Sequence, residues 1–208
     1  MRPASGKDAC AAATPEQRIR AQLEARSIVL IGMPGSGKSA LGRRLAPRLE
    51  LPFVDVDEEI ERAAGKSIKE IFADHGEAYF RDGERRVIAR LLASGPQVLA
   101  TGGGALLNEE TRANIASSGI AVWVKAAVAI LVRRVAKRST RPLFEGRDPE
   151  VVVKGLMDVR YPVYAAAADL TVESRDVPHE VIVGEMVDAL ARCPRLAGPA
   201  CGGETATP

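Results

Sequence analysis

The sequence has few cysteines, no excess of charge of one sign and no long apolar run. Its three cysteines lie toward the two ends, are odd in number and share no metal-ligand spacing, which argues against a disulfide framework and fits a reducing compartment. Lys and Arg number 29 against 27 Asp and Glu, so the net charge of +2 gives no reason to expect a nucleic-acid or anionic membrane partner. The apolar segment AVWVKAAVAILV is interrupted by Lys125, and the N-terminus lacks the core of a secretion signal. We therefore expect a cytoplasmic protein.

The pattern of apolar residues indicates the α/β class. Five short β-rich runs alternate with helical patterns, namely SIVLIG, PFVDVD, QVLATG, IAVWVKA and DLTVES. This alternation predicts a parallel sheet flanked by helices. The ends at 1–13 and 194–208 are rich in small or polar residues without periodicity, so we expect disordered tails around one domain at 14–193.

Capping residues mark three helix starts, at Thr14–Gln17, Ser67–Glu70 and Asp148–Pro149. Two residues do not fit the expected helices. Pro47 removes a hydrogen bond from the helix LGRRLAPRLE, where it should kink or end the last turn. Gly83 interrupts YFRDGERRVIARLLA, at a cost of about 1 kcal/mol relative to Ala.

The segment GMPGSGKSALG, residues 32–42, fits the phosphate-binding pattern G-x-x-x-x-G-K-[ST] between an expected strand and an expected helix. Its glycines let backbone N–H groups converge on phosphate oxygens, and the helix N-terminus adds partial positive charge. Lys38 should reach the β- and γ-phosphates, and the Ser39 hydroxyl should ligate Mg²⁺. The alternative is a glycine-rich turn that binds nothing. The loop leaves the acceptor open, because ATPases, GTPases and small-molecule kinases share it.

Two carboxylates end the second apolar run. Residues two apart on a strand face the same side, so Asp55 and Asp57 should emerge together beside the phosphate loop. One can serve Mg²⁺ through its water shell, and the other can hold an acceptor hydroxyl and take its proton. The alternative is that they only cap the helix that follows.

Arg81 and Glu84 are three residues apart on an expected helix. They either form an exposed ion pair of little consequence or a clamp, in which Glu84 holds Arg81 toward a substrate carboxylate. The run 102–104 consists of three glycines after the third strand, more than a plain turn requires, and its backbone can pass close to a ligand.

The polar segment RSTRPLFEGRDPE, residues 138–150, is broken by Pro and Gly and carries several arginines. It has the composition of a mobile lid. An arginine delivered by such a lid neutralises charge on a phosphoryl group in transfer. The alternative is a solvated basic loop.

In this order, the motifs G-x-x-G-x-G-K-S, D-V-D, F-R-x-x-E, G-G-G and R-P-L resemble those of the shikimate kinases, which are P-loop small-molecule kinases of the aromatic amino-acid pathway. The resemblance covers about residues 27–192. It implies a three-layer P-loop kinase fold with a central five-stranded parallel sheet and a mobile lid. It also implies transfer of the ATP γ-phosphate to the 3-hydroxyl of shikimate, with Mg²⁺ as cofactor. The expected partners are ATP and shikimate, and we expect a monomer.

The resemblance assigns roles to individual residues. The expected catalytic residues are Lys38, Asp57 and Arg141. The expected ATP-binding residues are Gly35, Ser36, Gly37, Lys38, Ser39, Ala40, Arg134 and Arg141. The expected shikimate-binding residues are Asp57, Arg81, Gly102, Gly103, Gly104 and Arg160, with Glu84 supporting Arg81. The expected Mg²⁺ residues are Ser39 and Asp55.

Other functions fit part of the pattern. A gluconate-type sugar-acid kinase shares the loop and lid but does not require F-R-x-x-E together with G-G-G, and a nucleoside monophosphate kinase fits less well. A catalytically inactive nucleotide-binding regulatory module is the alternative outside the enzymes. A GTPase switch is disfavoured, because the guanine-reading motif N/T-K-x-D is missing from the sequence.

Overall fold

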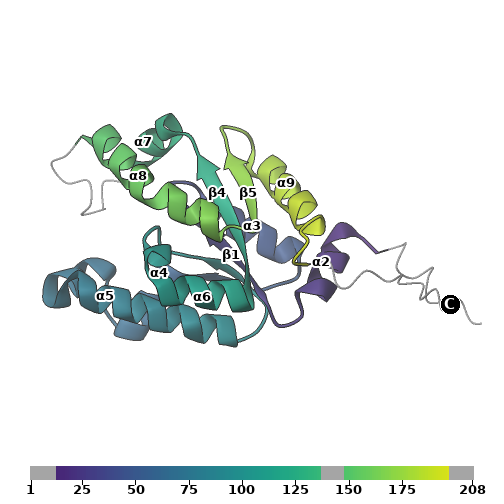
Figure 1. Ribbon diagram of the computed structural model, residues 1–208, viewed down its shortest axis with the longest axis horizontal. Helices are drawn as coiled ribbons and strands as arrows, with labels where there is room; N and C mark the ends of the chain where they lie inside the picture. The colour runs from purple at the N-terminus through teal and green to yellow at the C-terminus, as the bar shows by residue number, and fades with distance from the viewer. Residues whose placement is uncertain (1–12, 137–147, 197–208) are drawn as a thin grey trace, which may run out of the picture.

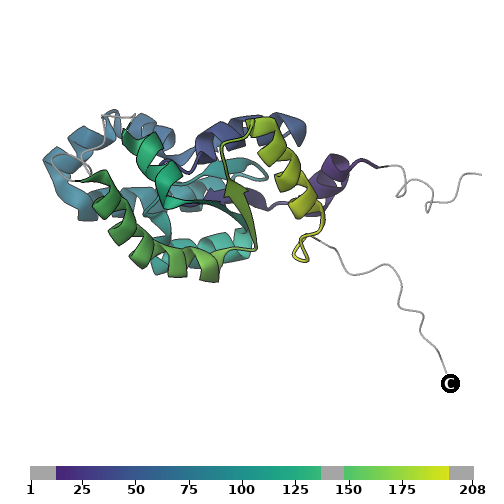
Figure 2. The same ribbon diagram turned by 90° about the horizontal axis from the view of Figure 1, so that it is seen from above.

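The computed structural model describes residues 13–136 and 148–196, which form a parallel sheet with helices on both faces (Figures 1 and 2). The strands are β1 (Ser27–Ile31), β2 (Phe53–Asp55), β3 (Val98–Ala100), β4 (Gly119–Ala126) and β5 (Leu170–Ser174). They lie in the order β2-β3-β1-β4-β5, and all neighbouring pairs are parallel. All five apolar runs are thus confirmed as strands, and so is the predicted sheet.

The central strand β1 is buried on both faces, and its side chains alternate between two helical layers. Ile28 and Leu30 pack against one layer, whereas Val29 and Ile31 pack against the other. The first layer contains α2 (Pro15–Leu23), α3 (Lys38–Arg48) and α9 (His179–Ala191). The second contains α4 (Val56–Ala64), α5 (Ile68–Ala93), α6 (Glu109–Ser118), α7 (Val128–Ala136) and α8 (Pro149–Ala167). The expected three-layer arrangement is therefore confirmed.

The predicted helix starts are also confirmed. The Thr14 side chain accepts a hydrogen bond from the backbone N–H of Gln17, and Ser67 accepts one from Glu70 in the same way. The Asp148 side chain caps α8 directly before Pro149. These signals predict well because a side-chain cap depends only on residues within one turn.

The two irregular helix residues differ in their effect. Pro47 lies in the last turn of α3, which ends at the next residue, as expected. Gly83 does not break α5, in contrast to what the sequence suggested. The break lies at Gly76 instead, where φ is 78° and ψ is 178°, a combination that glycine adopts without a Cβ penalty.

Two predicted boundaries need correction. The predicted lid at 138–150 falls mostly outside the described residues, but 148–150 form the cap and first turn of α8. The domain also continues past its predicted end at 193, because Leu196 is buried and Arg195 pairs with Asp169 at 2.9 Å. The composition of this end does not indicate order, but one buried apolar residue and one ion pair hold it to the core. Of the predicted tails, residues 1–12 and 197–208 lie outside the described residues.

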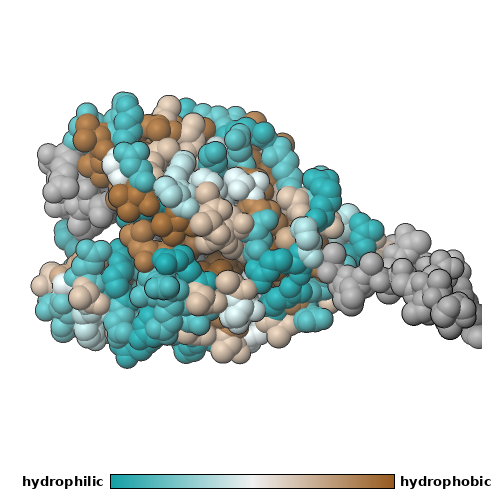
Figure 3. Space-filling model, in the orientation of Figure 1, coloured by the Kyte–Doolittle hydropathy of each residue, from teal (hydrophilic) through white to brown (hydrophobic). Residues whose placement is uncertain are grey.

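Apolar side chains follow the outer surface of α8 in the space-filling view (Figure 3), and Val151 and Val159 are among the exposed ones.

Within 13–136 and 148–196, no helix combines the length and the apolar character needed to cross a membrane.

Candidate active site

The candidate residues gather at one edge of the sheet, where β1, β2 and β3 end. Because β1 lies between β3 and β4, the chain fills the sheet on one side of β1 and then on the other. Ligands of open parallel sheets bind outside the carboxyl ends of the strands at such a switch point. The phosphate loop leaves β1 here, Asp55 ends β2 and the three glycines follow β3.

The loop between β1 and α3 has the backbone that a phosphate cradle requires. Gly35 and Gly37 have φ values of 84° and 101°, which a residue with a Cβ rarely adopts. A Cβ on Gly32 would lie 2.5 Å from the carbonyl oxygen of Val124, so the loop also passes too close to β4 for a side chain. Gly37 is the N-cap residue of α3 and no side chain caps this helix, so its first turn can offer backbone N–H groups to an anion.

Lys38 and Ser39 follow the loop at the start of α3. The Lys38 side chain is buried, and its Nζ donates hydrogen bonds to the carbonyl oxygens of Gly32 at 2.8 Å and Met33 at 3.0 Å. The ammonium group is thereby held against the loop. The Ser39 hydroxyl lies 2.6 Å from Oδ2 of Asp55, which brings together the two oxygen donors that were predicted as Mg²⁺ residues.

Ser36 lies on the phosphate loop, and Arg134 of α7 lies beside it. Oγ of Ser36 is buried and has no hydrogen-bond partner in the part of the chain that the structure describes. Buried polar atoms are normally paired, so this oxygen is suited to a ligand contact. Arg134 of α7 donates from Nη1 to the Ser174 hydroxyl at 2.8 Å and to the carbonyl oxygens of Gly35 and Ser36 at 3.4 Å. No motif in the sequence points to Ser174, which ends β5 and holds this arginine by a hydrogen bond.

The prediction that Asp55 and Asp57 share one face of a strand is wrong. The strand ends at Asp55, and α4 begins at Val56, so Asp57 lies in the first helical turn. Oδ1 of Asp55 accepts a hydrogen bond from the backbone N–H of Asp57 at 3.1 Å. The capping alternative is therefore correct for Asp55, although its second oxygen still binds Ser39. A strong cap overrides a short strand because it satisfies a backbone donor of the new helix.

The three glycines after β3 approach the charged candidates closely. A Cβ on Gly102 would lie 2.5 Å from Oε1 of Glu84 and 3.1 Å from Oδ1 of Asp57. A Cβ on Gly104 would lie 2.7 Å from Nη2 of Arg81. Side chains from α4 and α5 thus come so close to this backbone that a Cβ would clash with them, which supports the expectation that the glycines permit a close approach.

Glu84 is nearly inaccessible at 2% relative exposure, so its ion pair with Arg81 is not the exposed pair that the simpler interpretation assumed. Oε2 of Glu84 accepts from Nη1 of Arg81 at 2.7 Å, while Glu77 accepts from Nε and Nη2 at 3.2 Å. Burial raises the pKa of the Glu84 carboxyl above its ordinary value, against the lowering effect of Arg81. Its Oε1 has no hydrogen-bond partner among the described residues and adjoins Gly102.

Arg160 enters from α8 and has only 7% relative exposure. Its Nη1 lies 3.0 Å from the position of a Cβ on Gly103, which would also meet Cδ of Pro34 at 2.7 Å. One turn further along α8, the Tyr164 hydroxyl donates a hydrogen bond to the Gly103 carbonyl oxygen. Burial raises the pKa of Tyr164 to about 12, so the hydroxyl keeps its proton and remains a donor at neutral pH. The sequence analysis missed Tyr164, whose only signal is its spacing from Arg160.

The structure therefore brings together all the predicted site residues that it describes. Lys38, Ser39 and Asp55 form the phosphate side, and Asp57, Arg81 and Arg160 surround the three glycines. Ala40 lies in the first turn of α3, next to the phosphate side. Arg141 lies outside the described residues.

A phosphate loop beside a cluster of carboxylate and guanidinium groups, built on this parallel sheet, defines a P-loop kinase for a small molecule. The shikimate kinase family model matches residues 34–191. A shikimate kinase of Bradyrhizobium diazoefficiens is 55% identical over 94% of this chain and 91% of its own, and one of Caulobacter vibrioides is 56% identical over 82% and 84%.

Solved structures agree. A structure of shikimate kinase from Acinetobacter baumannii in complex with shikimate matches with a TM-score of 0.77 and 33% identity, over 82% of this chain and 95% of the other. A gluconokinase from Sinorhizobium meliloti matches with a TM-score of 0.52 and 21% identity, over 81% of this chain and 93% of the other, which shows a shared fold alone. The chain belongs to the shikimate kinase family. The predicted family and the predicted ATP-dependent phosphotransferase activity are confirmed.

Proposed function

We propose that the chain transfers the γ-phosphate of ATP to the 3-hydroxyl of shikimate. The observation that carries this proposal is the convergence of Arg81 and Arg160 on the glycines at 102–104. These glycines follow β3, which lies next to β1, so they stand at the same edge of the sheet as the phosphate loop. Shikimate is a small carboxylated polyol. Two guanidinium groups suit its carboxylate, and Asp57 with the glycine backbone suits its hydroxyls.

On the nucleotide side, Lys38 binds the phosphates together with the backbone N–H groups of the loop. Ser39 and Asp55 are suited to Mg²⁺, because they are hard oxygen donors at the edge of the phosphate cradle. When bound there, the ion supplies positive charge that offsets the negative charge of the phosphate oxygens. The described residues contain no group of three or more His, Cys, Asp or Glu side chains suited to a metal, so water and phosphate would complete its shell.

On the acceptor side, Arg81 and Arg160 bind the carboxylate, and Glu84 positions Arg81. Asp57 orients the 3-hydroxyl and accepts its proton while the hydroxyl oxygen bonds to the γ-phosphorus. The bond between that phosphorus and the bridging oxygen of ADP breaks in the same in-line step. Arg141 is our candidate for stabilising the charge of the phosphoryl group in transfer.

The test is ADP release from Mg²⁺-ATP with shikimate, gluconate, AMP or no acceptor. We expect turnover that depends on shikimate. Turnover with gluconate or AMP instead would reassign the acceptor, and ATP binding without acceptor-dependent turnover would favour a regulatory module.

A further inference from the structure

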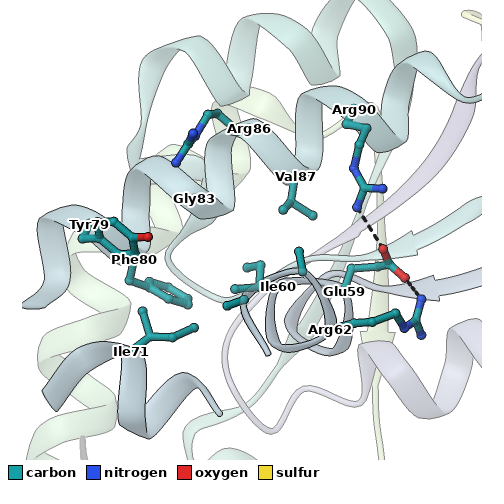
Figure 4. Close-up of a pocket in the computed structure, with 12 residues that line it drawn as sticks. Glu59, Ile60, Arg62, Ile71, Tyr79, Phe80, Gly83, Arg86, Val87 and Arg90 are labelled. Carbon is teal, nitrogen blue, oxygen red and sulfur yellow. Dashed lines mark hydrogen bonds and ion pairs between the residues drawn. The ribbon is translucent and has the colours of Figure 1, made fainter. Parts of the chain in front are cut away.

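A cavity lies between α4 and α5, outside the candidate active site (Figure 4). Its volume is about 450 Å³, which is within the range of small-molecule sites. Asp57, Arg81 and Arg160 do not line it. A molecule bound in this cavity would therefore not occupy the proposed shikimate site.

The interior of the cavity is apolar. Its floor consists of Ile60 from α4 and of Ile71, Phe80 and Val87 from α5, and Figure 4 shows these side chains projecting into the space between the two helices. All four are buried in the second-layer core. The floor is therefore firmly packed and gives an apolar molecule a fixed surface to contact.

Gly83 forms part of the cavity wall, and the open cavity gives a reason for a glycine at this position of the helix. A Cβ at this position would meet no atom within 4 Å, so neither packing nor backbone geometry requires glycine here. The residue nevertheless weakens the helix by about 1 kcal/mol relative to Ala. Its effect on the structure is to leave the space above the floor open.

The rim of the cavity carries an excess of positive charge. Arg62, Arg86 and Arg90 line it together with a single carboxylate, Glu59. Glu59 pairs with both Arg62 and Arg90, at 2.9 Å for Arg90, so its one charge is shared by two guanidinium groups.

The third rim arginine, Arg86, takes part in an exposed ion pair. Arg86 pairs with Asp82 at 3.0 Å, while Arg85 pairs with both Asp82 at 2.8 Å and Glu110 at 2.7 Å. Arg86 is largely exposed, and exposed ion pairs of this kind contribute little. Its guanidinium group can therefore turn to an anion at the cavity mouth at small cost.

We propose that this cavity binds a small amphipathic anion, with an apolar body of one or two rings on the floor beside Gly83 and a carboxylate or sulfonate at the arginine rim. The apolar floor accounts for the body, the open wall for its entry and the arginine excess for the sign of its charge. Phe80 connects this cavity to the proposed acceptor site, since the Arg81 guanidinium lies 5.1 Å from the centre of its ring.

The test is a fluorescence titration of the full chain with 8-anilinonaphthalene-1-sulfonate, which has apolar rings and one sulfonate. We expect saturable binding that persists in the presence of saturating shikimate. No saturable binding, or displacement of the probe by shikimate, would overturn the proposal. This binding readout is independent of turnover, so it can fail or succeed whatever the acceptor assay shows.

Matched variants locate the bound probe. Gly83→Leu fills the wall and should raise the probe Kd about tenfold or more, whereas Gly83→Ala should change it less than about threefold. Arg86→Gln should raise the Kd about threefold to tenfold, while Arg44→Gln, at an exposed arginine of α3 that pairs with Glu180 outside the lining, should leave it unchanged. Equal affinity of Gly83→Leu and wild type would contradict the proposal. If Gly83→Leu fails to fold, equal affinities of the two arginine variants would contradict it.

Discussion

Gly102→Ala is the substitution that most directly probes how closely the glycine backbone approaches the acceptor-side carboxylates. The new methyl group would lie 2.5 Å from Oε1 of Glu84 and 3.1 Å from Oδ1 of Asp57. The first distance is roughly 1 Å shorter than ordinary van der Waals contact. Glu84 is packed in the core and cannot swing into solvent, so the strain passes to its ion pair with Arg81.

The expected magnitude follows from this displacement. A shift of about 1 Å in a group that positions a substrate can cost about 10²-fold in rate. We therefore expect Gly102→Ala to lower kcat/KM for shikimate by about 10²-fold, mainly through a higher KM. The KM for ATP should change little, because Lys38 and Ser39 lie on the other side of the site.

The assay is steady-state ADP release with each substrate varied in turn, and the control is Gly155→Ala. Gly155 lies in α8, and a Cβ there would meet no atom within 4 Å, so this control adds a methyl group without a clash. An unchanged KM for shikimate in folded Gly102→Ala, or an equal loss for both substrates, would refute the reasoning.

Three further predictions concern single groups of the site. Asp57→Asn should lower kcat/KM by about 10² to 10⁴-fold, and near-wild-type activity would reject the base role. Tyr164→Phe removes the donor to the Gly103 carbonyl, so it should cost about 1–2 kcal/mol in denaturant unfolding and raise the KM for shikimate but not for ATP. The raised pKa of Glu84 means that the folded state binds its proton more tightly, so wild-type stability should fall relative to Glu84→Gln as the pH rises above about 4.5. Unfolding curves whose difference is independent of pH between 4 and 8 would contradict this.

The sequence predicted those features that depend on local signals. The helix starts at Thr14, Ser67 and Asp148 each depend on a cap within one turn, and the strands depend on short apolar runs. The glycine pattern of the loop likewise predicted a backbone free of side-chain clash, and Gly35 and Gly37 in this loop have positive φ.

Features that depend on tertiary contacts were beyond this reasoning. Propensity marks Gly83 as the weak point of α5, yet the break falls at Gly76, because only the folded chain decides where the helix must turn. The burial of Glu84 was equally hidden, since the spacing of Arg81 and Glu84 also fits an exposed pair. Tyr164 contacts a carbonyl 61 residues away in the chain, and no local pattern encodes such a contact.

The most direct test of the account compares shikimate with its neutral carboxamide as acceptors. If Arg81 and Arg160 bind the carboxylate, each charged hydrogen bond contributes about 1.5–3 kcal/mol, so wild type should prefer shikimate by about 10²-fold or more in kcat/KM. Arg81→Ala should lower this preference about tenfold or more and leave the share that Arg160 contributes, whereas Arg85→Ala, an arginine on the same helix but outside the site, should keep it in full. Equal turnover of the two acceptors by wild type would contradict the account.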